Sequence, residues 1–258
     1  MDAPTLVNHS LHYVMTMNAP GTAAAEQLDN VRALVRHATQ RLLGDTISVS
    51  ENDWRAASRL PDWTRGHVAT HLARHADGMR RLVEWARTGE RHEMYASPEQ
   101  RTSEIEDGSG RSGLDLQIDL DTSAGRLAAG FEALDAADRW DAIVELRDAT
   151  PVPARLLPLS RLLEVIIHHV DLDIGFEVDN IDQQTAEWLL EWCAYRFRSR
   201  DDFPRLTLTS DSGFTVHVGK SGEPRQVSGT SPNLLGWLMN RVDPSAVSGA
   251  NGLQVPGL

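Results

Sequence analysis

One segment of the chain, Leu157–Gly175, combines an almost continuous aliphatic sequence with a regular polar stripe. Its polar side chains recur every three or four positions, which on a helix places them on one face. They are Arg161, Glu164, His168 and Asp171. The other positions are mostly leucine, isoleucine and valine, so the segment predicts a helix that is buried on several sides. An ionised glutamate in such a helix is costly unless another group neutralises it.

This stripe has two interpretations. Glu164 and His168 present a carboxylate and an imidazole on adjacent turns, a pair that can share a divalent metal ion. Alternatively, the stripe is simply the side of the helix that faces solvent. A metal site would need a third ligand from another part of the chain.

Composition narrows the classes of function. The 258 residues suffice for one large domain or two small ones, and the net charge is −12. Because no basic run or alternation of basic and aromatic residues occurs, we expect no nucleic-acid partner. No apolar stretch approaches the length of a membrane span, so we expect no membrane partner either.

The first residues lack the basic and apolar regions of a signal peptide. We predict a flexible leader over residues 1–22, with Met15 or Met17 as alternative starts. The single cysteine, Cys193, excludes an internal disulfide and predicts a cytoplasmic protein. Because Cys193 stands among tryptophans and leucines, we interpret it as a buried structural thiol rather than a nucleophile.

Hydrophobic periodicity predicts four long helices in the first two-thirds of the chain. They span about residues 23–43, 64–88, 114–134 and 157–175, with Thr64 as an N-cap and Gly89 as a C-terminal stop. A shorter helix is predicted after Ser97-Pro98. Four helices of this length predict a bundle, which we assign to residues 23–178.

Residues 179–258 have a different pattern, which predicts a small α+β domain. A tryptophan-rich helix is expected over residues 183–198 and a last helix over 233–241. Three short strands are expected between them, at residues 205–210, 214–218 and 225–228. Asp211-Ser212-Gly213 and Lys220-Ser221-Gly222 are the predicted turns.

The second predicted helix carries three histidines, four positions apart: His67, His71 and His75. His71 and His75 fall within its apolar stripe, and His67 lies at the edge. A single inward histidine is usually a hydrogen-bonded core residue, but helical bundles also build metal sites from side chains on facing helices. Two histidines and one carboxylate would leave an open position on Zn²⁺, as catalytic sites do.

These motifs resemble one family. The segment Trp63–Arg74 is similar to the W-T-R-x-H-x-x-x-H segment of mycothiol-dependent maleylpyruvate isomerases, members of the DinB-like metalloenzyme superfamily. The resemblance continues through Thr88-Gly89-Glu90 to Met94-Tyr95-Ala96-Ser97, which is its most specific part. It resumes at the polar stripe and covers nearly everything after about residue 25.

The resemblance implies a mainly α fold, in which a DinB-like four-helix bundle precedes a small domain similar to sterol-carrier proteins. It implies zinc ligands at His71, Glu164 and His168, and a catalytic arginine at Arg241 within the last helix. His75 is not carried over as a ligand, and we interpret His169 as a packing residue or a support behind the ligands.

Further residues are candidates with open alternatives. Met94, Tyr95 and Arg101 are candidate contacts of substrate or thiol, although Met94 and Tyr95 would serve equally well as loop anchors. Asp171 and Arg161 are candidates for holding the ligands from behind, although Asp171 would also suit a helix cap. Without the resemblance, Arg241 would be interpreted as an arginine that binds the last carbonyls of a helix. The tryptophans at 63, 85, 188, 192 and 237 are interpreted as core residues.

The expected function is zinc- and mycothiol-dependent isomerisation of maleylpyruvate to fumarylpyruvate in gentisate-type aromatic catabolism. A thiolate adds reversibly to the cis double bond, which allows rotation before the thiolate leaves. The expected partners are this small-molecule substrate and the low-molecular-weight thiol, with the protein a monomer or weak homodimer. The alternatives are another mycothiol-dependent S-transferase on the same scaffold and a non-catalytic zinc-binding interaction module.

Overall fold

The computed structural model describes residues 22–198 and 200–256, and the chain divides into two compact units. The first unit is Asn30–Glu177; the second begins at Val178, and the start of the first described helix, up to Asp29, groups with it. Helices dominate the described residues, so the prediction of a mainly α fold is confirmed. The predicted leader lies almost wholly outside the described residues. Among the helices that are described, none is long and apolar enough to cross a membrane.

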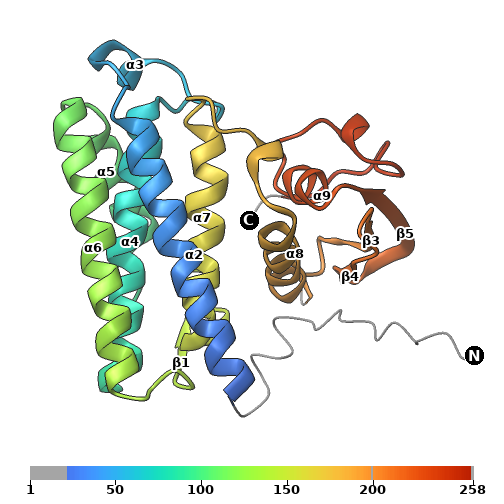
Figure 1. The fold of residues 1–258 in the computed structure, drawn as a ribbon, viewed down its shortest axis with the longest axis horizontal. Coiled ribbons are helices and arrows are strands. Elements are labelled where there is room, and N and C mark those ends of the chain that lie inside the picture. The colour runs from blue at the N-terminus through green and yellow to red at the C-terminus, as the bar shows by residue number, and fades with distance from the viewer. Residues whose placement is uncertain (1–21, 199, 257–258) are drawn as a thin grey trace, which may run out of the picture. The chain divides into compact units, whose positions relative to one another are not determined.

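Four long helices form the bundle of the first unit: α2 (Thr22–Thr46), α4 (Arg65–Thr88), α6 (Gly113–Ala136) and α7 (Leu157–Asp171). They run side by side in Figure 1. Leu42, Leu72, Leu120 and Val165, one from each helix, belong to the same buried cluster. The four predicted helices are therefore confirmed, with ends that differ from the prediction by up to four residues.

Local signals explain where α4 begins and ends. Thr64 accepts a hydrogen bond from the His67 amide, and the His67 ring accepts one from the Thr64 amide, which forms a capping box. Gly89 ends the helix in the left-handed conformation, with φ of 82°. The predicted short helix is α5 (Pro98–Ser109), which packs against α4.

Three short elements of the first unit were not predicted. They are α3 (Glu51–Arg55) and a two-stranded antiparallel hairpin, β1 (Ile143–Glu145) and β2 (Pro151–Pro153), which leads through a 3₁₀ turn (Ala154–Leu156) into α7. With three to five residues each, these elements are too short to show a periodicity in the sequence.

The second unit contains α8 (Gln183–Phe197), α9 (Ser231–Leu238) and a three-stranded sheet, with 3₁₀ turns at Val178–Asn180 and Pro244–Ala246. The strands β3 (Pro204–Ser210), β4 (Thr215–Val218) and β5 (Ser221–Gly229) lie in the order β4-β3-β5. β3 is antiparallel to β4 and parallel to β5. Helix α8 packs against α9 and β4, which confirms the predicted small α+β unit.

Two details of this unit were predicted wrongly. The third strand starts at Ser221 rather than Arg225, because the turn is made at Gly219, where the chain passes the start of β3. Gly219 has φ of 68°, and a Cβ there would lie 2.2 Å from the Pro204 carbonyl oxygen, so only glycine fits. The last helix ends at Leu238, and Asn240 adopts a left-handed conformation with φ of 59°. Arg241 therefore lies beyond the helix rather than within it.

Candidate metal centre

Three side chains from two helices meet within the first unit. The Nε2 atom of His71 on α4 lies 3.0 Å from Glu164 Oε2 and 3.0 Å from His168 Nε2, both on α7. His168 Nε2 is 3.4 Å from the same carboxylate oxygen. All three ligand atoms lie within 4.8 Å of one another, close enough to bind one metal ion together. This group is called the His/Glu/His cluster below.

The rest of the polar stripe on α7 lies behind this cluster. Asp171 is fully buried, and its Oδ2 atom lies 2.7 Å from His168 Nδ1. Arg161 is also buried and donates to the Leu72 carbonyl oxygen at 2.9 Å. The interpretation of the stripe as a solvent-facing side is therefore wrong, since both ends of the stripe are inside the unit.

The other two histidines of α4 have separate roles. His67 caps the helix and places its Nε2 atom 3.2 Å from Glu106 on α5. His75 is buried, accepts a hydrogen bond from Arg161 Nη1 at 3.2 Å, and its Nε2 atom is 3.8 Å from Glu164 Oε1. Neither histidine belongs to the group of three that can share an ion.

Burial and charge set the protonation of the cluster. Burial lowers the pKa of His71 to about 4 and that of His75 to about 3, so both rings are neutral near neutral pH. Burial opposes ionisation of Glu164, but the nearby histidines outweigh it and hold the pKa of Glu164 well below its usual value. Burial also opposes protonation of His168, yet hydrogen bonds to Asp171 and Glu164 raise its pKa overall.

The donor set fits a zinc ion. Two imidazole nitrogens and one carboxylate oxygen are ordinary zinc ligands, and three of them leave a coordination position open. Asp171 accepts from His168 Nδ1, which directs the lone pair of Nε2 toward the cluster. Without a cation among them, the facing Nε2 atoms of His71 and His168 can make one hydrogen bond at most.

Helix α5 and the loop that precedes it bring a cation and a phenol to the surroundings of the cluster. Arg101 donates to His71 Nδ1 at 3.1 Å, and its guanidinium lies 5.7 Å from the Tyr95 ring centre. The Tyr95 hydroxyl is buried and has no hydrogen-bond partner among the described residues; burial raises its pKa. Met94 is buried as well, and its carbonyl oxygen accepts from Arg81 at 2.6 Å and 3.0 Å. Met94 thus anchors the loop, while Arg101 and Tyr95 reach the surroundings of the cluster.

One neighbour of the cluster was assigned only a packing role by the sequence. The Trp63 ring stacks on His67 and is tilted against His71, with the Trp63 and His71 ring centres 5.6 Å apart. Trp63 precedes the N-cap of α4, a position that carries no periodicity and so no signal of this contact.

The remaining candidates have contacts within their own units. His169 stacks on Phe176 and places its Nε2 atom 3.1 Å from Asp45 of α2. In the second unit, Cys193 is fully buried, and burial raises its pKa to about 12. Arg241 donates from its main chain to Gly236 O at 2.7 Å and from Nη1 to the Met239 carbonyl oxygen.

The fold and cluster define a class of protein, a helical bundle with a two-histidine, one-carboxylate centre. Residues 21–173 match the family model described as the mycothiol maleylpyruvate isomerase N-terminal domain. Because this match covers more than half of the chain, the chain belongs to the mycothiol maleylpyruvate isomerase family, and the recognition made from the sequence motifs is confirmed.

Two solved structures are similar over most of the chain. One is a mycothiol-dependent maleylpyruvate isomerase, with 27% identity and a TM-score of 0.78. The other is a histidine-to-alanine variant of an enzyme of the same name, with 26% identity and the same TM-score. Each alignment covers 89% of this chain and 95% of the other. These likenesses confirm the predicted fold class, a DinB-like bundle with a small C-terminal domain. Comparison with curated protein sequences gives no match.

Proposed function

We propose that the protein is a zinc-dependent isomerase that uses mycothiol to convert maleylpyruvate into fumarylpyruvate. One observation carries the proposal: His71, Glu164 and His168 converge within 4.8 Å in a member of the mycothiol maleylpyruvate isomerase family. The two similar structures, named for this activity, support the choice of substrate and thiol. The expected place of the reaction is aromatic catabolism in the cytoplasm.

In this proposal His71, Glu164 and His168 hold the zinc ion. A zinc ion bound there would lower the pKa of the cosubstrate thiol, which is otherwise mostly protonated at neutral pH. Asp171 holds the His168 ring in the tautomer that offers Nε2. His71 binds through Nε2 only when Nδ1 carries the proton, so Arg101 loses its acceptor on that ring and its charge is available to an anion.

The reaction balances without an oxidant or reductant. The thiolate sulfur forms a bond to one alkene carbon, and the π electrons move onto the conjugated carbonyl oxygen as an enolate. Rotation about the new single bond follows. The enolate then returns its electrons, the carbon–sulfur bond breaks, and the thiolate leaves with the trans product.

Residues of this chain can stabilise the charge that develops. We assign Arg101 to a substrate carboxylate, because a guanidinium offers two parallel donors. We assign the Tyr95 hydroxyl to the enolate oxygen, because a buried hydroxyl without a partner is a donor with no competing bond. Arg241, in the second unit, is assigned to the same developing charge on the basis of the family resemblance.

The test is a rate assay with purified protein, maleylpyruvate and one of three thiols: mycothiol, glutathione or none. Turnover that requires mycothiol, together with about one zinc per chain, is expected. Tyr95→Phe should lower kcat by about tenfold or more at unchanged zinc content. Zinc binding without isomerisation would reject the substrate assignment, and conjugation of mycothiol to an acceptor would favour the S-transferase alternative. Zinc binding without any thiol-dependent activity would favour the non-catalytic interaction module.

A further inference from the structure

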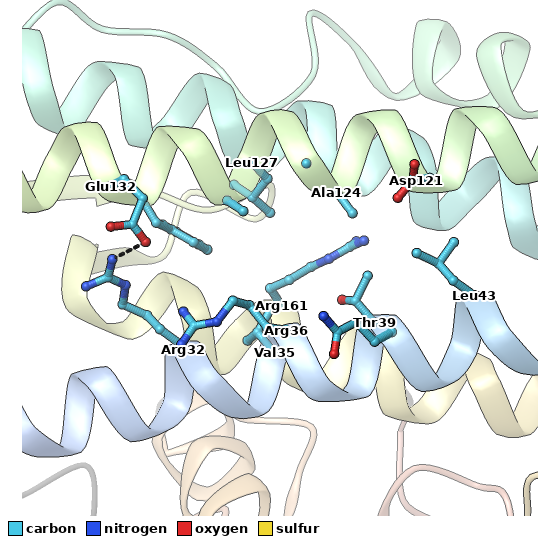
Figure 2. Close-up of a pocket in the computed structure, with 14 residues that line it drawn as sticks. Arg32, Val35, Arg36, Thr39, Leu43, Asp121, Ala124, Leu127, Glu132 and Arg161 are labelled. Atoms are coloured by element: carbon cyan, nitrogen blue, oxygen red, sulfur yellow. Dashed lines mark hydrogen bonds and ion pairs between the residues drawn. The ribbon is translucent and has the colours of Figure 1, made fainter.

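A cavity lies in the first unit, between α2 and α6. Figure 2 shows side chains from these two helices facing each other across it, with Arg161 of α7 also in its wall. The cavity has a volume of about 170 Å³. None of the residues that line it belongs to the His/Glu/His cluster, so it is a separate site.

The wall changes character with depth. Exposed polar side chains, including Arg36, Gln40 and Asp121, surround the entrance. Val35, Leu127 and Phe131 are buried and provide an apolar middle. A bound molecule would therefore keep an apolar body between the two helices.

Arg161 brings a buried positive charge without an ion-pair partner among the described residues to the cavity. Its side chain is only 2% exposed, and its Nη1 atom donates to Leu72 O and His75 Nδ1. Within the described part of the chain, no carboxylate lies at ion-pair distance from Arg161. Burial lowers its pKa to about 10, because water no longer solvates the charge.

The neighbouring charges do not offset it. Arg32 is held by Glu132 at 2.6 Å and by Asp135 at 3.3 Å, and Figure 2 shows the first of these ion pairs at one end of the cavity. That leaves Arg36 and Arg161 against the single carboxylate of Asp121 among the lining residues. The charge balance of the cavity thus favours an anionic ligand.

We propose that this cavity binds a small aromatic monocarboxylate, with its carboxylate on Arg161 and its ring between α2 and α6. A dry cavity of about 150 Å³ accepts a benzene ring, so about 170 Å³ accommodates a ring with one small substituent. A guanidinium binds a carboxylate through two parallel hydrogen bonds, which a neutral alcohol cannot reproduce.

The first test compares two ligands on the intact, metal-loaded protein by fluorine NMR titration. The probes are 4-fluorobenzoate and its neutral counterpart 4-fluorobenzyl alcohol. The carboxylate should bind about tenfold more tightly or better. Equal affinity for the two probes would overturn the proposal, because the cavity would then select only for an apolar ring.

Matched variants locate the binding. Ala124 lines the cavity on α6, whereas Ala129 is exposed on the same helix and does not line it. Ala124→Phe should weaken 4-fluorobenzoate binding by about tenfold or more, and Ala129→Phe should leave it within about twofold. Unchanged binding in Ala124→Phe would overturn the proposal. The comparison of the two probes on the unmodified protein stays decisive even if Ala124→Phe fails to fold.

A last control separates this site from the metal centre. Because a carboxylate can also bind a metal ion, 4-fluorobenzoate is titrated into His71→Ala as well. Affinity within about twofold of the unmodified protein is expected. Loss of binding in this variant would place the probe at the His/Glu/His cluster and overturn the proposal. These titrations measure ligand binding and not isomerase activity. Their result can therefore be interpreted even if the proposed isomerase function is wrong.

Discussion

The two units bury polar side chains in different ways. In Asn30–Glu177, the buried groups face one another: His71 meets Glu164 and His168, while Asp171 and Arg161 lie behind them. In the second unit, the buried thiol of Cys193 lies among Leu189, Leu190 and Trp192, all fully or almost fully buried. The other buried polar side chains among the described residues of this unit are Thr185, Glu191, Ser210 and Ser231, and Ser231 donates to Glu187 at 3.0 Å.

This difference has a physical meaning. A buried set of ionisable groups generally costs stability relative to apolar residues of the same volume, so its presence calls for another reason. Shifted pKa values in such a set are typical of sites that bind ions or perform chemistry. An isolated buried thiol with a raised pKa is inert and needs no such reason. The comparison predicts that substitutions in the first cluster change chemistry, whereas Cys193 affects only packing.

The largest expected effect follows from removing a ligand of the cluster. His71→Ala and Glu164→Gln should each reduce zinc from about one per chain to less than about a tenth, with activity at background. Metal analysis after gel filtration and a rate assay measure this. His75→Ala is the matched control on the same face of α4 and should retain zinc, because His75 lies outside the group of three. Full zinc retention in both ligand variants would reject the metal centre.

Asp171→Asn should have the next largest effect. The variant keeps the size of the side chain but loses the charged acceptor that fixes the His168 tautomer. Metal affinity or activity should fall by about 10- to 100-fold. A chelator competition titration gives the affinity. If affinity and activity are both unchanged, Asp171 is a buried helix-end residue with no part in the site.

Arg241→Lys extends the comparison to the second unit. If Arg241 binds a carboxylate or the enolate, loss of the planar guanidinium should lower kcat/KM by about tenfold or more, at unchanged zinc content. If Arg241 only binds the carbonyl of Met239 beyond α9, kinetics should stay normal and the melting temperature should fall slightly. Steady-state rates measured beside a thermal melt decide between the two.

Much of the His/Glu/His cluster could be predicted from the sequence, because its residues follow helical spacing. The stripe on α7 and the histidines of α4 are periodic, so their shared faces follow from the sequence. Spacing on one helix could not show that His75 pairs with Arg161 whereas His71 meets Glu164, since both histidines lie in the apolar stripe. That distinction came from the family resemblance, and it depends on how α4 packs against α7.

Other features of the site and fold could not be predicted, because they depend on contacts between elements that leave no periodic pattern in the sequence. Arg101 reaches His71 Nδ1 from α5, and Trp63 contacts the His71 ring from the residue before the cap of α4. The end of α9 was predicted too late, because the apolar run up to Met239 gives no sign that the helix stops at Leu238 and that Asn240 is left-handed. The parallel pairing of β5 with β3 likewise depends on a turn at Gly219. The sequence instead predicted the turn at Lys220-Ser221-Gly222, whose last two residues belong to β5.

The stability of the first unit without metal should also depend on pH. Burial lowers the pKa of His71 to about 4, of His75 to about 3 and of His169 to about 4. The unfolded chain therefore binds more protons below about pH 6.5, and the stability due to these neutral rings falls as the pH falls toward 4. The raised pKa of His168 acts in the opposite direction, since its contribution is present below about pH 6.5 and is lost as the pH rises.

Each of the three depressed rings should lose about 2 kcal/mol between pH 7 and pH 5, and the one opposing ring offsets only part of this, so the free energy of unfolding should decrease by several kcal/mol. Urea denaturation of chelator-treated protein at both values measures this. Zinc should raise the free energy of unfolding more at pH 7 than at pH 5, since ligand protonation competes with metal binding. Greater stability at pH 5 than at pH 7 would show that His168 dominates.

The smallest effect is expected at Cys193. The thiol is fully buried in α8, and burial raises its pKa to about 12, so almost no thiolate forms at neutral pH. Cys193→Ala removes one buried atom and should cost about 1 kcal/mol of stability, with zinc content, kcat and the requirement for mycothiol unchanged. A thermal melt beside the rate assay measures both.

A folded Cys193→Ala protein without activity would show that the sulfur of the protein itself attacks the alkene. The contrast between a reactive His/Glu/His cluster and an unreactive buried thiol would then be wrong. Retained activity that still needs added mycothiol leaves the small-molecule thiol as the nucleophile, because the chain has no other cysteine.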